Sequence, residues 1–198
     1  MMHHGGTNGG DGLYIIDALK MIQKYGGCEE KYWKYEECNP GNPQPRAEEN
    51  AEQHKINVYA KLDTLDSIKK SLLVNGPCVA GVFVYSNWGQ NWSTGEIPMP
   101  GESEFLGGHA ICIVGYDDDK KYLKFKNSWG PEWGDNGYGY LPYDYMSLDG
   151  SEAWGITDLI IDPEPLIQSK EKVLEDLGVE FKDKSQEFKD FETTIKFH

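Results

Sequence analysis

The sequence predicts an α+β domain in which short helices precede a largely antiparallel β-sheet. Two observations predict this class. Apolar residues recur at helical spacing in residues 14–25 and 63–75, before the long apolar runs begin. After Gly76-Pro77, runs of β-branched and aromatic residues alternate with turns rich in glycine or aspartate, which is typical of paired strands.

Each predicted helix has its own start and stop signals. Residues 14–25 carry apolar side chains every three or four positions and are followed by a Gly-Gly pair, which ends a helix. In residues 63–75 either Asp63 or Thr64 can cap the first turn, and a Gly-Pro pair stops the helix. Residues 29–53 are polar and contain prolines, so we expect an irregular surface loop there.

Four apolar runs are expected as strands: residues 79–85, 109–116, 121–127 and 137–141. The second and third are separated only by Asp117-Asp118-Asp119, so they should form a hairpin. A calcium site at these aspartates is the disfavoured alternative, because the ligand spacing is wrong. Tryptophans, glycines and prolines dominate between the first two strands and indicate a long structured loop.

The sequence changes character after Asp162. Two prolines follow, and the remaining residues are largely charged, with apolar side chains at helical spacing. We therefore expect one domain in residues 1–162 and a charged helical tail in residues 163–198. The sequence contains no internal repeat.

Composition narrows the classes of partner. The net charge of −14 argues against nucleic acid or an anionic membrane as partner. No apolar stretch reaches the roughly 18–20 residues that a membrane span needs. Residues 1–6 lack the basic region and apolar run of a signal peptide, so any targeting segment would lie upstream. We expect a soluble protein of unknown compartment.

The residues that carry chemistry lie between Gly107 and Tyr140. The sequence Gly-Gly-His-Ala places His109 at the start of an apolar strand. The sequence Lys-Asn-Ser-Trp-Gly places Asn127 at the end of the partner strand, and Trp-Gly and Gly-Tyr pairs follow. Antiparallel pairing of the two strands should therefore bring His109 and Asn127 side by side on one face.

This order of motifs resembles the papain family of cysteine peptidases, peptidase family C1. The Asn-Gly-Gly sequence at residues 8–10 looks like the family's glycine strand along the substrate cleft, and Gly76-Pro77 resembles the start of a strand in its second lobe. The resemblance covers roughly residues 5–160. It implies a papain-like fold with an incomplete helical lobe, an antiparallel β-sheet or barrel lobe and a C-terminal helical appendage.

The resemblance also implies residue roles. In that family a thiolate attacks the peptide carbonyl, and a histidine protonates the leaving amine. His109 would be the acid/base residue, Asn127 would orient its ring, and Trp129 would shield their contact from water. The implied substrate-binding residues are Gly9, Gly10 and Ala110. Peptides or proteins would be the substrates, and neither a metal nor a cofactor is implied.

The family's nucleophilic cysteine and oxyanion-hole glutamine are absent from the sequence, which starts at about the glycine strand. We expect none of the four cysteines to replace the nucleophile. Cys112 is an odd number of strand positions from His109 and should face the other way. Cys78 lies in a buried strand by pattern, and neither Cys28 nor Cys38 precedes the expected helix.

Two hypotheses follow from this departure. In the first, the chain is part of a cysteine peptidase whose nucleophile comes from an upstream segment or a companion chain, and it is inactive alone. In the second, the chain is a catalytically dead structural or binding module of a larger assembly. Its tail, residues 163–198, would then be a contact surface for that assembly.

Overall fold

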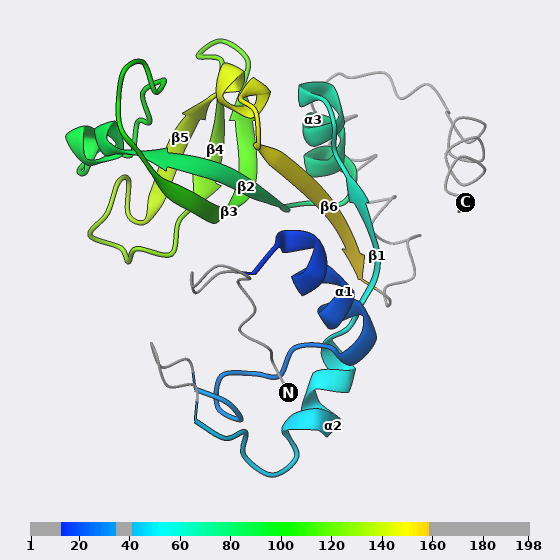
Figure 1. The fold of residues 1–198 in the computed structure, drawn as a ribbon. Coiled ribbons are helices and arrows are strands. Elements are labelled where there is room, and N and C mark those ends of the chain that lie inside the picture. Colours follow the sequence, from blue (N-terminus) through cyan, green and yellow to red (C-terminus); the bar gives the residue numbers. More distant parts are fainter. Residues whose placement is uncertain (1–12, 35–40, 159–198) are drawn as a thin grey trace, which may run out of the picture. The chain divides into compact units, whose positions relative to one another are not determined.

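The computed structural model describes residues 13–34 and 41–158, and the expectations for Cys38 and for the tail of residues 163–198 lie outside them. Figure 1 shows helices that lead into a β-sheet, which confirms the predicted α+β class. The helices are α1 (Ile15–Tyr25), α2 (Ala47–Ala51) and α3 (Leu65–Val74), with short 3-10 helices η1 (Glu52–His54), η2 (Ser86–Asn91) and η3 (Tyr143–Ser147). None of the described helices is long and apolar enough to cross a membrane.

Within residues 13–34 and 41–158, six strands form one antiparallel sheet in the order β1-β6-β2-β3-β4-β5. The strands are β1 (Ile56–Lys61), β2 (Cys78–Tyr85), β3 (Phe105–Asp117), β4 (Tyr122–Lys126), β5 (Tyr138–Pro142) and β6 (Glu152–Asp158). The predicted hairpin is the pair β3 and β4. Strand β3 begins four residues earlier than expected because Phe105 and the following glycines pair with the end of β2.

Two expectations need correction. Residues 29–53 are not irregular throughout, since they end in α2 and η1. The Asn50 side chain accepts a hydrogen bond from the Glu29 backbone N–H at 2.8 Å and donates one to the Glu29 carboxylate at 2.9 Å, which ties this helix to the loop before it. Strands β1 and β6 were not expected either. Strand β6 joins the sheet between β1 and β2, and both of these strands are far from β6 in sequence.

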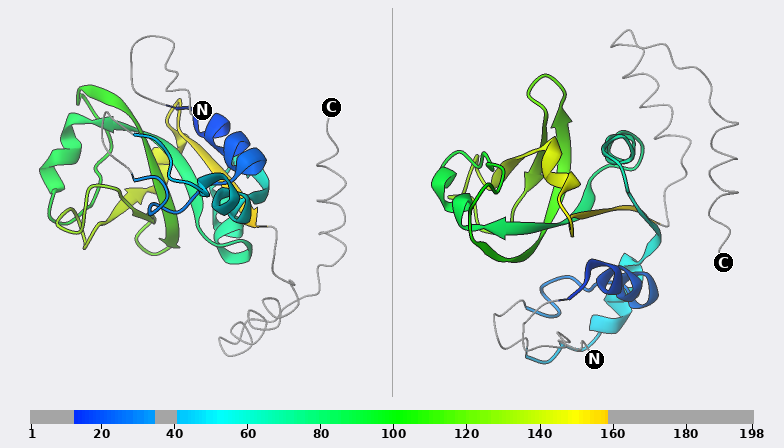
Figure 2. Two further views of the ribbon diagram at one scale, coloured as in Figure 1. Left: turned by 90° about the horizontal axis from the view of Figure 1, so that it is seen from below. Right: turned by 45° about the horizontal axis from the view of Figure 1, so that its top comes forward.

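Helices α1 and α3 lie on opposite faces of the sheet (Figures 1 and 2). Thr64, one of the two expected caps, caps α3 in a reciprocal pair with Ser67, and Ile68 of α3 enters the core. On the other face, α1 approaches β2 so closely that a Cβ at Gly81 would lie 3.1 Å from Ile15 Cδ1. We call the face toward α3 the core face and the face toward α1 the outer face.

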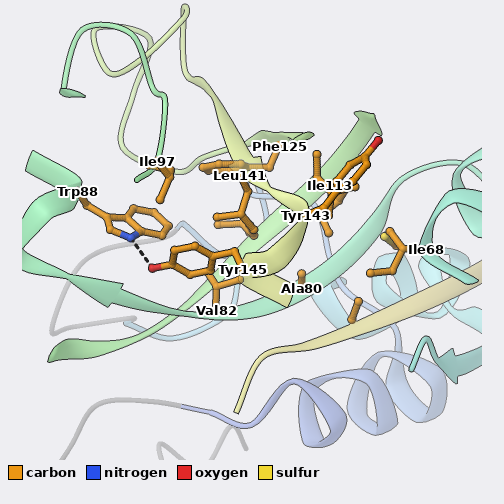
Figure 3. Close-up of a cluster of buried hydrophobic side chains, with 14 of the residues drawn as sticks. Ile68, Ala80, Val82, Trp88, Ile97, Ile113, Phe125, Leu141, Tyr143 and Tyr145 are labelled. Atoms are coloured by element: carbon orange, nitrogen blue, oxygen red, sulfur yellow. Dashed lines mark hydrogen bonds between the residues drawn. The ribbon is translucent and has the colours of Figure 1, made fainter. Parts of the chain in front are cut away.

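The core lies between the curved sheet and the 3-10 helices η2 and η3 (Figure 3). Trp88 Nε1 donates a hydrogen bond to the Tyr145 hydroxyl at 2.8 Å, and that hydroxyl donates to the Phe83 carbonyl at 2.7 Å. Both polar groups are therefore satisfied inside an apolar core, as burial requires. Trp133 is fully buried in the same core.

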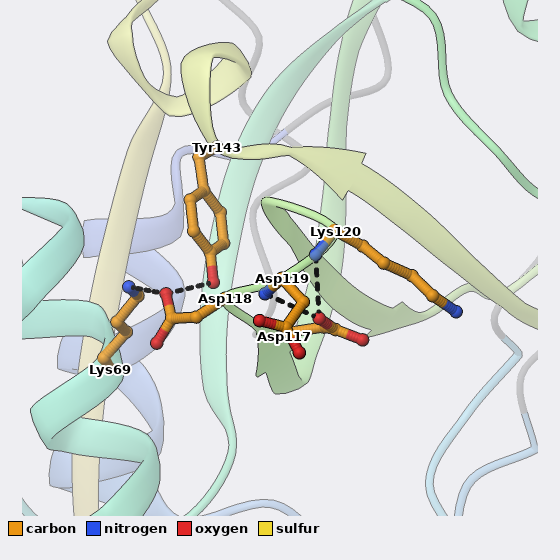
Figure 4. Close-up of polar contacts among 6 residues, drawn as sticks. All are labelled: Lys69, Asp117, Asp118, Asp119, Lys120 and Tyr143. Atoms are coloured by element: carbon orange, nitrogen blue, oxygen red, sulfur yellow. Dashed lines mark hydrogen bonds and ion pairs between the residues drawn. The ribbon is translucent and has the colours of Figure 1, made fainter.

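Two aspartates of the turn between β3 and β4 accept hydrogen bonds that hold the turn in place (Figure 4). Asp117 Oδ1 accepts hydrogen bonds from the backbone N–H groups of Asp119, at 3.0 Å, and Lys120, at 2.9 Å. Asp118 Oδ1 contacts Lys69 Nζ on α3 and accepts a hydrogen bond from the Tyr143 hydroxyl at 3.0 Å. The turn is thus fastened to α3 and η3.

This fastening predicts a pH-dependent stability. The hydrogen bond from Lys69, and then that from Tyr143, lower the pKa of Asp118 below its usual value. Asp118 therefore stabilises the fold above its unfolded-state pKa, and this contribution is lost as the pH falls through the folded-state pKa. Replacing Asp118→Asn should lower the thermal midpoint at neutral pH, and the difference from the parent should vanish in acid. Asp119→Asn, which removes an exposed carboxylate with no side-chain partner, is the control; an equal effect from both would contradict the assignment.

Candidate active site

His109 and Asn127 lie on the core face of the β3–β4 hairpin. On β3 the side chains of Ile111 and Ile113 are buried, and His109 continues the same alternation toward the start of the strand. On β4 Phe125 is fully buried, and Asn127, two residues further on, is 8% exposed. The strand period of two therefore places both polar side chains at one edge of the core.

A hydrogen bond joins the two side chains. His109 Nε2 lies 2.8 Å from Asn127 Oδ1, and the Ser128 backbone N–H donates to the same oxygen at 2.8 Å. A backbone N–H can only donate, so the Asn127 atom that accepts from Ser128 is the amide oxygen. His109 Nε2 must therefore carry a proton, which it donates to that oxygen. That leaves Nδ1 as the nitrogen able to take up or release a proton, and no described group forms a hydrogen bond with it.

Aromatic rings enclose this pair. Trp129 stacks against the His109 ring with centroids 5.0 Å apart and an interplanar angle of 26°. Trp88 meets His109 edge-on at 6.3 Å, and Trp133 meets Trp129 edge-on at 5.3 Å. The His109–Asn127 hydrogen bond therefore lies at the edge of an aromatic cluster, where the local dielectric constant is lower than that of water and a hydrogen bond is stronger.

The chain is similar to known proteins in sequence and in fold. The sequence profile of the papain family of cysteine proteases matches residues 2–152. The chain belongs to this family. An uncharacterized peptidase C1-like protein of Acanthamoeba polyphaga mimivirus is 36% identical over 167 residues, which are 77% of this chain and 53% of that protein. A cathepsin B-like protein of Giardia intestinalis, CP3, is 41% identical over 138 residues, 65% of this chain and 46% of that protein.

Solved structures of the family have the same fold. Xylellain, a cysteine protease from Xylella fastidiosa, is 32% identical and superposes with a TM-score of 0.68 over 76% of this chain and 63% of its own. A cysteine protease of Carica candamarcensis, at 21% identity and a TM-score of 0.56, covers 75% of this chain and 70% of its own and shows the fold alone. The chain spans about half the length of the curated relatives it matches.

Three further residues, Gly9, Gly10 and Ala110, were expected to bind the substrate in this papain-family site. Of these three, only Ala110 lies in the part of the chain that the structure describes. It is exposed on the outer face of β3, directly after His109, and pairs with Gly81 of β2. Gly9 and Gly10 lie outside the described residues. The structure thus brings His109, Asn127 and Trp129 together and places Ala110 on the outer face of the sheet, opposite to His109.

Sequence reasoning missed two aromatic members of the site. Trp88 lies under His109 from η2, and Trp92 stacks parallel to Trp129, with centroids 6.0 Å apart and an interplanar angle of 10°. Both lie in the long loop after β2, for which the family motifs predict no role. Their only signal was the density of tryptophan in that loop.

The two strand cysteines are poorly placed to act as the nucleophile. Cys112 pairs with Val79 and lies on the outer face, opposite to His109. Cys78 lies on the core face, but four residues along β2 from the residue paired with His109, roughly 13 Å away. Burial raises the pKa of both thiols, that of Cys78 to about 12. A reactive cysteine needs a lowered pKa, so these two are structural thiols.

A hollow of about 310 Å³ opens beside the His109–Asn127 pair. Its floor is the outer face of strands β2, β3 and β4, beyond the point where α1 covers Gly81. The lining residues are Val79, Ala110, Ile111, Cys112, Lys126, Asn127 and Ser128. The lining includes the residues that directly follow His109 and Asn127 in sequence, so an element seated in the hollow would lie next to both.

Proposed function

We propose that this chain is the acid/base part of a papain-type cysteine peptidase, which hydrolyses peptide bonds in peptides or proteins. His109 is the acid/base residue and Asn127 positions its ring. The observation that carries the proposal is the 2.8 Å hydrogen bond from His109 Nε2 to Asn127 Oδ1, which leaves Nδ1 available. The nucleophilic thiol comes from a polypeptide segment other than the described residues.

The chemistry follows from that arrangement. A cysteine thiol next to Nδ1 gives its proton to the imidazole, and the thiolate attacks the peptide carbonyl carbon. As the carbon–nitrogen bond breaks, His109 returns the proton from Nδ1 to the leaving amine, and a thioester remains. Water, deprotonated by His109, then hydrolyses the thioester and restores the thiol. Asn127 holds the imidazolium through Nε2 during both steps.

The hollow is the proposed seat of the missing group. We define the nucleophile segment as a polypeptide with the family's glutamine and its Cys-Gly-Ser-Cys-Trp sequence. Seated in the hollow, it would bury the apolar side chains of Val79 and Ala110 and bring its thiol to the edge of the sheet at His109. Burial of that apolar surface supplies the driving force for docking.

Two samples test the proposal: the 198-residue chain alone, and the same chain with the nucleophile segment fused ahead of Met1. We expect no hydrolysis of fluorogenic peptides by the chain alone. The fusion protein should hydrolyse them and be labelled by a thiol-directed epoxide at one cysteine of the added segment. In the fusion, Cys112 should be protected from iodoacetamide because the segment covers the hollow, whereas Cys28 should react as before.

The two hypotheses predict different outcomes of the same experiment. A fusion protein that protects Cys112 but hydrolyses no peptide would overturn the peptidase assignment and favour a binding module. Hydrolysis by the chain alone, with epoxide labelling of one of its own cysteines, would show that no added segment is needed.

A further inference from the structure

Trp88 is the most deeply buried ring that contacts His109. It is 2% exposed, whereas Trp129, which stacks on the imidazole, is 37% exposed. Trp88 meets the His109 ring and the Trp129 ring edge-on, with centroids 6.3 Å and 5.9 Å away. Because side chains in a core are closely packed, a displacement of this indole would be transmitted to both rings.

Two hydrogen bonds in series hold this indole in the core (Figure 3). Trp88 Nε1 donates to the Tyr145 hydroxyl at 2.8 Å, and that hydroxyl donates to the Phe83 carbonyl at 2.7 Å. An indole N–H can only donate and a hydroxyl has a single proton, so the direction of both bonds is fixed. Phe83 follows Val82 on β2, and Val82 pairs with His109. The series thus runs from the ring beside His109 to the strand that pairs with it.

Tyr145 is itself held firmly in η3. Its side chain is fully buried, and its backbone carbonyl accepts hydrogen bonds from the Leu148 N–H at 3.2 Å and the Ser151 hydroxyl at 3.1 Å. Burial raises the pKa of the Tyr145 hydroxyl above its usual value, so the group keeps its proton at neutral pH. It therefore offers Trp88 a fixed acceptor and remains a donor to the sheet.

The hydrogen bond to Asn127 fixes only one atom of the His109 ring. With Nε2 held, the ring can still tilt about that contact, and a tilt changes the direction of Nδ1. The edge of Trp88 packs against the ring and limits this tilt. The direction of Nδ1 matters because a general acid must lie within hydrogen-bond reach of the group that it protonates.

We propose that Tyr145 is a positioning residue for His109. Its hydroxyl holds Trp88, and Trp88 holds the imidazole in the plane that directs Nδ1 at the reacting thiol and the leaving amine. This inference rests on the proposed function, because that function assigns proton transfer to Nδ1. The plane of the ring is a property of the chain itself and can be measured without turnover.

Tyr145→Phe in the full 198-residue chain removes the hydroxyl and keeps the aromatic ring. The carbon-bound protons of the His109 ring are followed by NMR and are assigned by their absence in His109→Ala. Their signals depend on the angle between the imidazole and the stacked Trp129, so we expect them to shift in Tyr145→Phe. Tyr143→Phe is the matched control, because it removes another buried hydroxyl of η3, which donates to Asp118. It should lower stability and leave the His109 signals unchanged.

Kinetics of the fusion protein separate positioning from stability. Tyr145→Phe should lower kcat about tenfold with little change in KM, because a misdirected ring slows proton transfer and not substrate binding. Trp88→Phe removes the donor of the same hydrogen bond, so it should shift the same signals, and it serves as the test if Tyr145→Phe does not fold. Adding Tyr145→Phe to Trp88→Phe should lower kcat by no more than about twofold further, since the bond is already absent.

Three results would overturn the inference: His109 signals that stay in place in both Tyr145→Phe and Trp88→Phe, an equal shift in Tyr143→Phe, or shifted signals with an unchanged kcat. A fusion protein that hydrolyses no peptide even without a substitution would overturn the proposed function instead. Shifted signals in Tyr145→Phe alone would then still identify Tyr145 as the residue that sets the plane of the His109 ring.

Discussion

Replacing His109→Ala in the fusion protein should lower kcat by about 10⁴-fold, since the same imidazole generates the thiolate and protonates the leaving amine. Nδ1 is the ring nitrogen left for proton transfer once Nε2 is held by Asn127. No described side chain is placed to take over this transfer. The measurement is steady-state hydrolysis of a fluorogenic peptide, with thiol titration to confirm that the cysteines of the added segment are present and reduced.

His54→Ala is the matched control for that prediction. His54 is exposed in η1 and its Nδ1 contacts the Asn50 carbonyl at 2.9 Å, so it resembles His109 in chemistry but not in position. Its replacement should leave kcat unchanged. Hydrolysis that survives His109→Ala, with epoxide labelling at the same cysteine, would remove His109 from the mechanism.

Replacing Asn127→Ala in the same fusion protein should lower kcat by about 10²-fold with little change in KM, because a misoriented ring no longer aligns with the leaving amine. The change also leaves two donors, His109 Nε2 and the Ser128 N–H, without their acceptor. We therefore expect a loss of stability of roughly 1–3 kcal/mol in addition. Kinetics and thermal unfolding of the same sample separate the two effects.

Two further variants identify the positioning role of Asn127. Asn127→Asp keeps an acceptor oxygen and should retain most of kcat. Asn87→Ala removes another buried asparagine, which donates to the Met99 carbonyl at 2.9 Å, and should lower stability without lowering kcat. If Asn127→Asp were as slow as Asn127→Ala, the loss could not be attributed to the missing acceptor.

The hairpin that carries the site is the part of the fold that local sequence specifies best. The turn alone does not set the register, because the pairing of β3 with β4 shifts at a bulge between Ile113 and Gly115. Apolar side chains alternate on both strands and enter one core, and this alternation puts His109 and Asn127 on the core face. This is why His109 and Asn127 could be placed on one face before the structure was known. The helix capped by Thr64 was predictable for the same reason, because its start and stop signals are local.

Other elements depend on contacts between distant residues. Strand β6 pairs with β1 and β2, whose residues precede it by about 70 to 100 positions, and its own composition is too mixed to show a strand. Helix α2 is only five residues long and is fastened by Asn50 to Glu29. Short elements of this kind are stabilised by tertiary contacts, because an isolated helix of this length is not stable in water.

Residue types and short spacings are enough to predict the α+β class and the histidine–asparagine pair, and to show that a Cys-Gly-Ser-Cys-Trp sequence is absent. The folded chain was needed to show which histidine nitrogen remains available, where the hollow opens and that Trp92 stacks on Trp129 at the site. These features depend on hydrogen-bond geometry, strand faces and the stacking of rings from two loops. Such distances between residues far apart in sequence leave no periodic pattern in the chain.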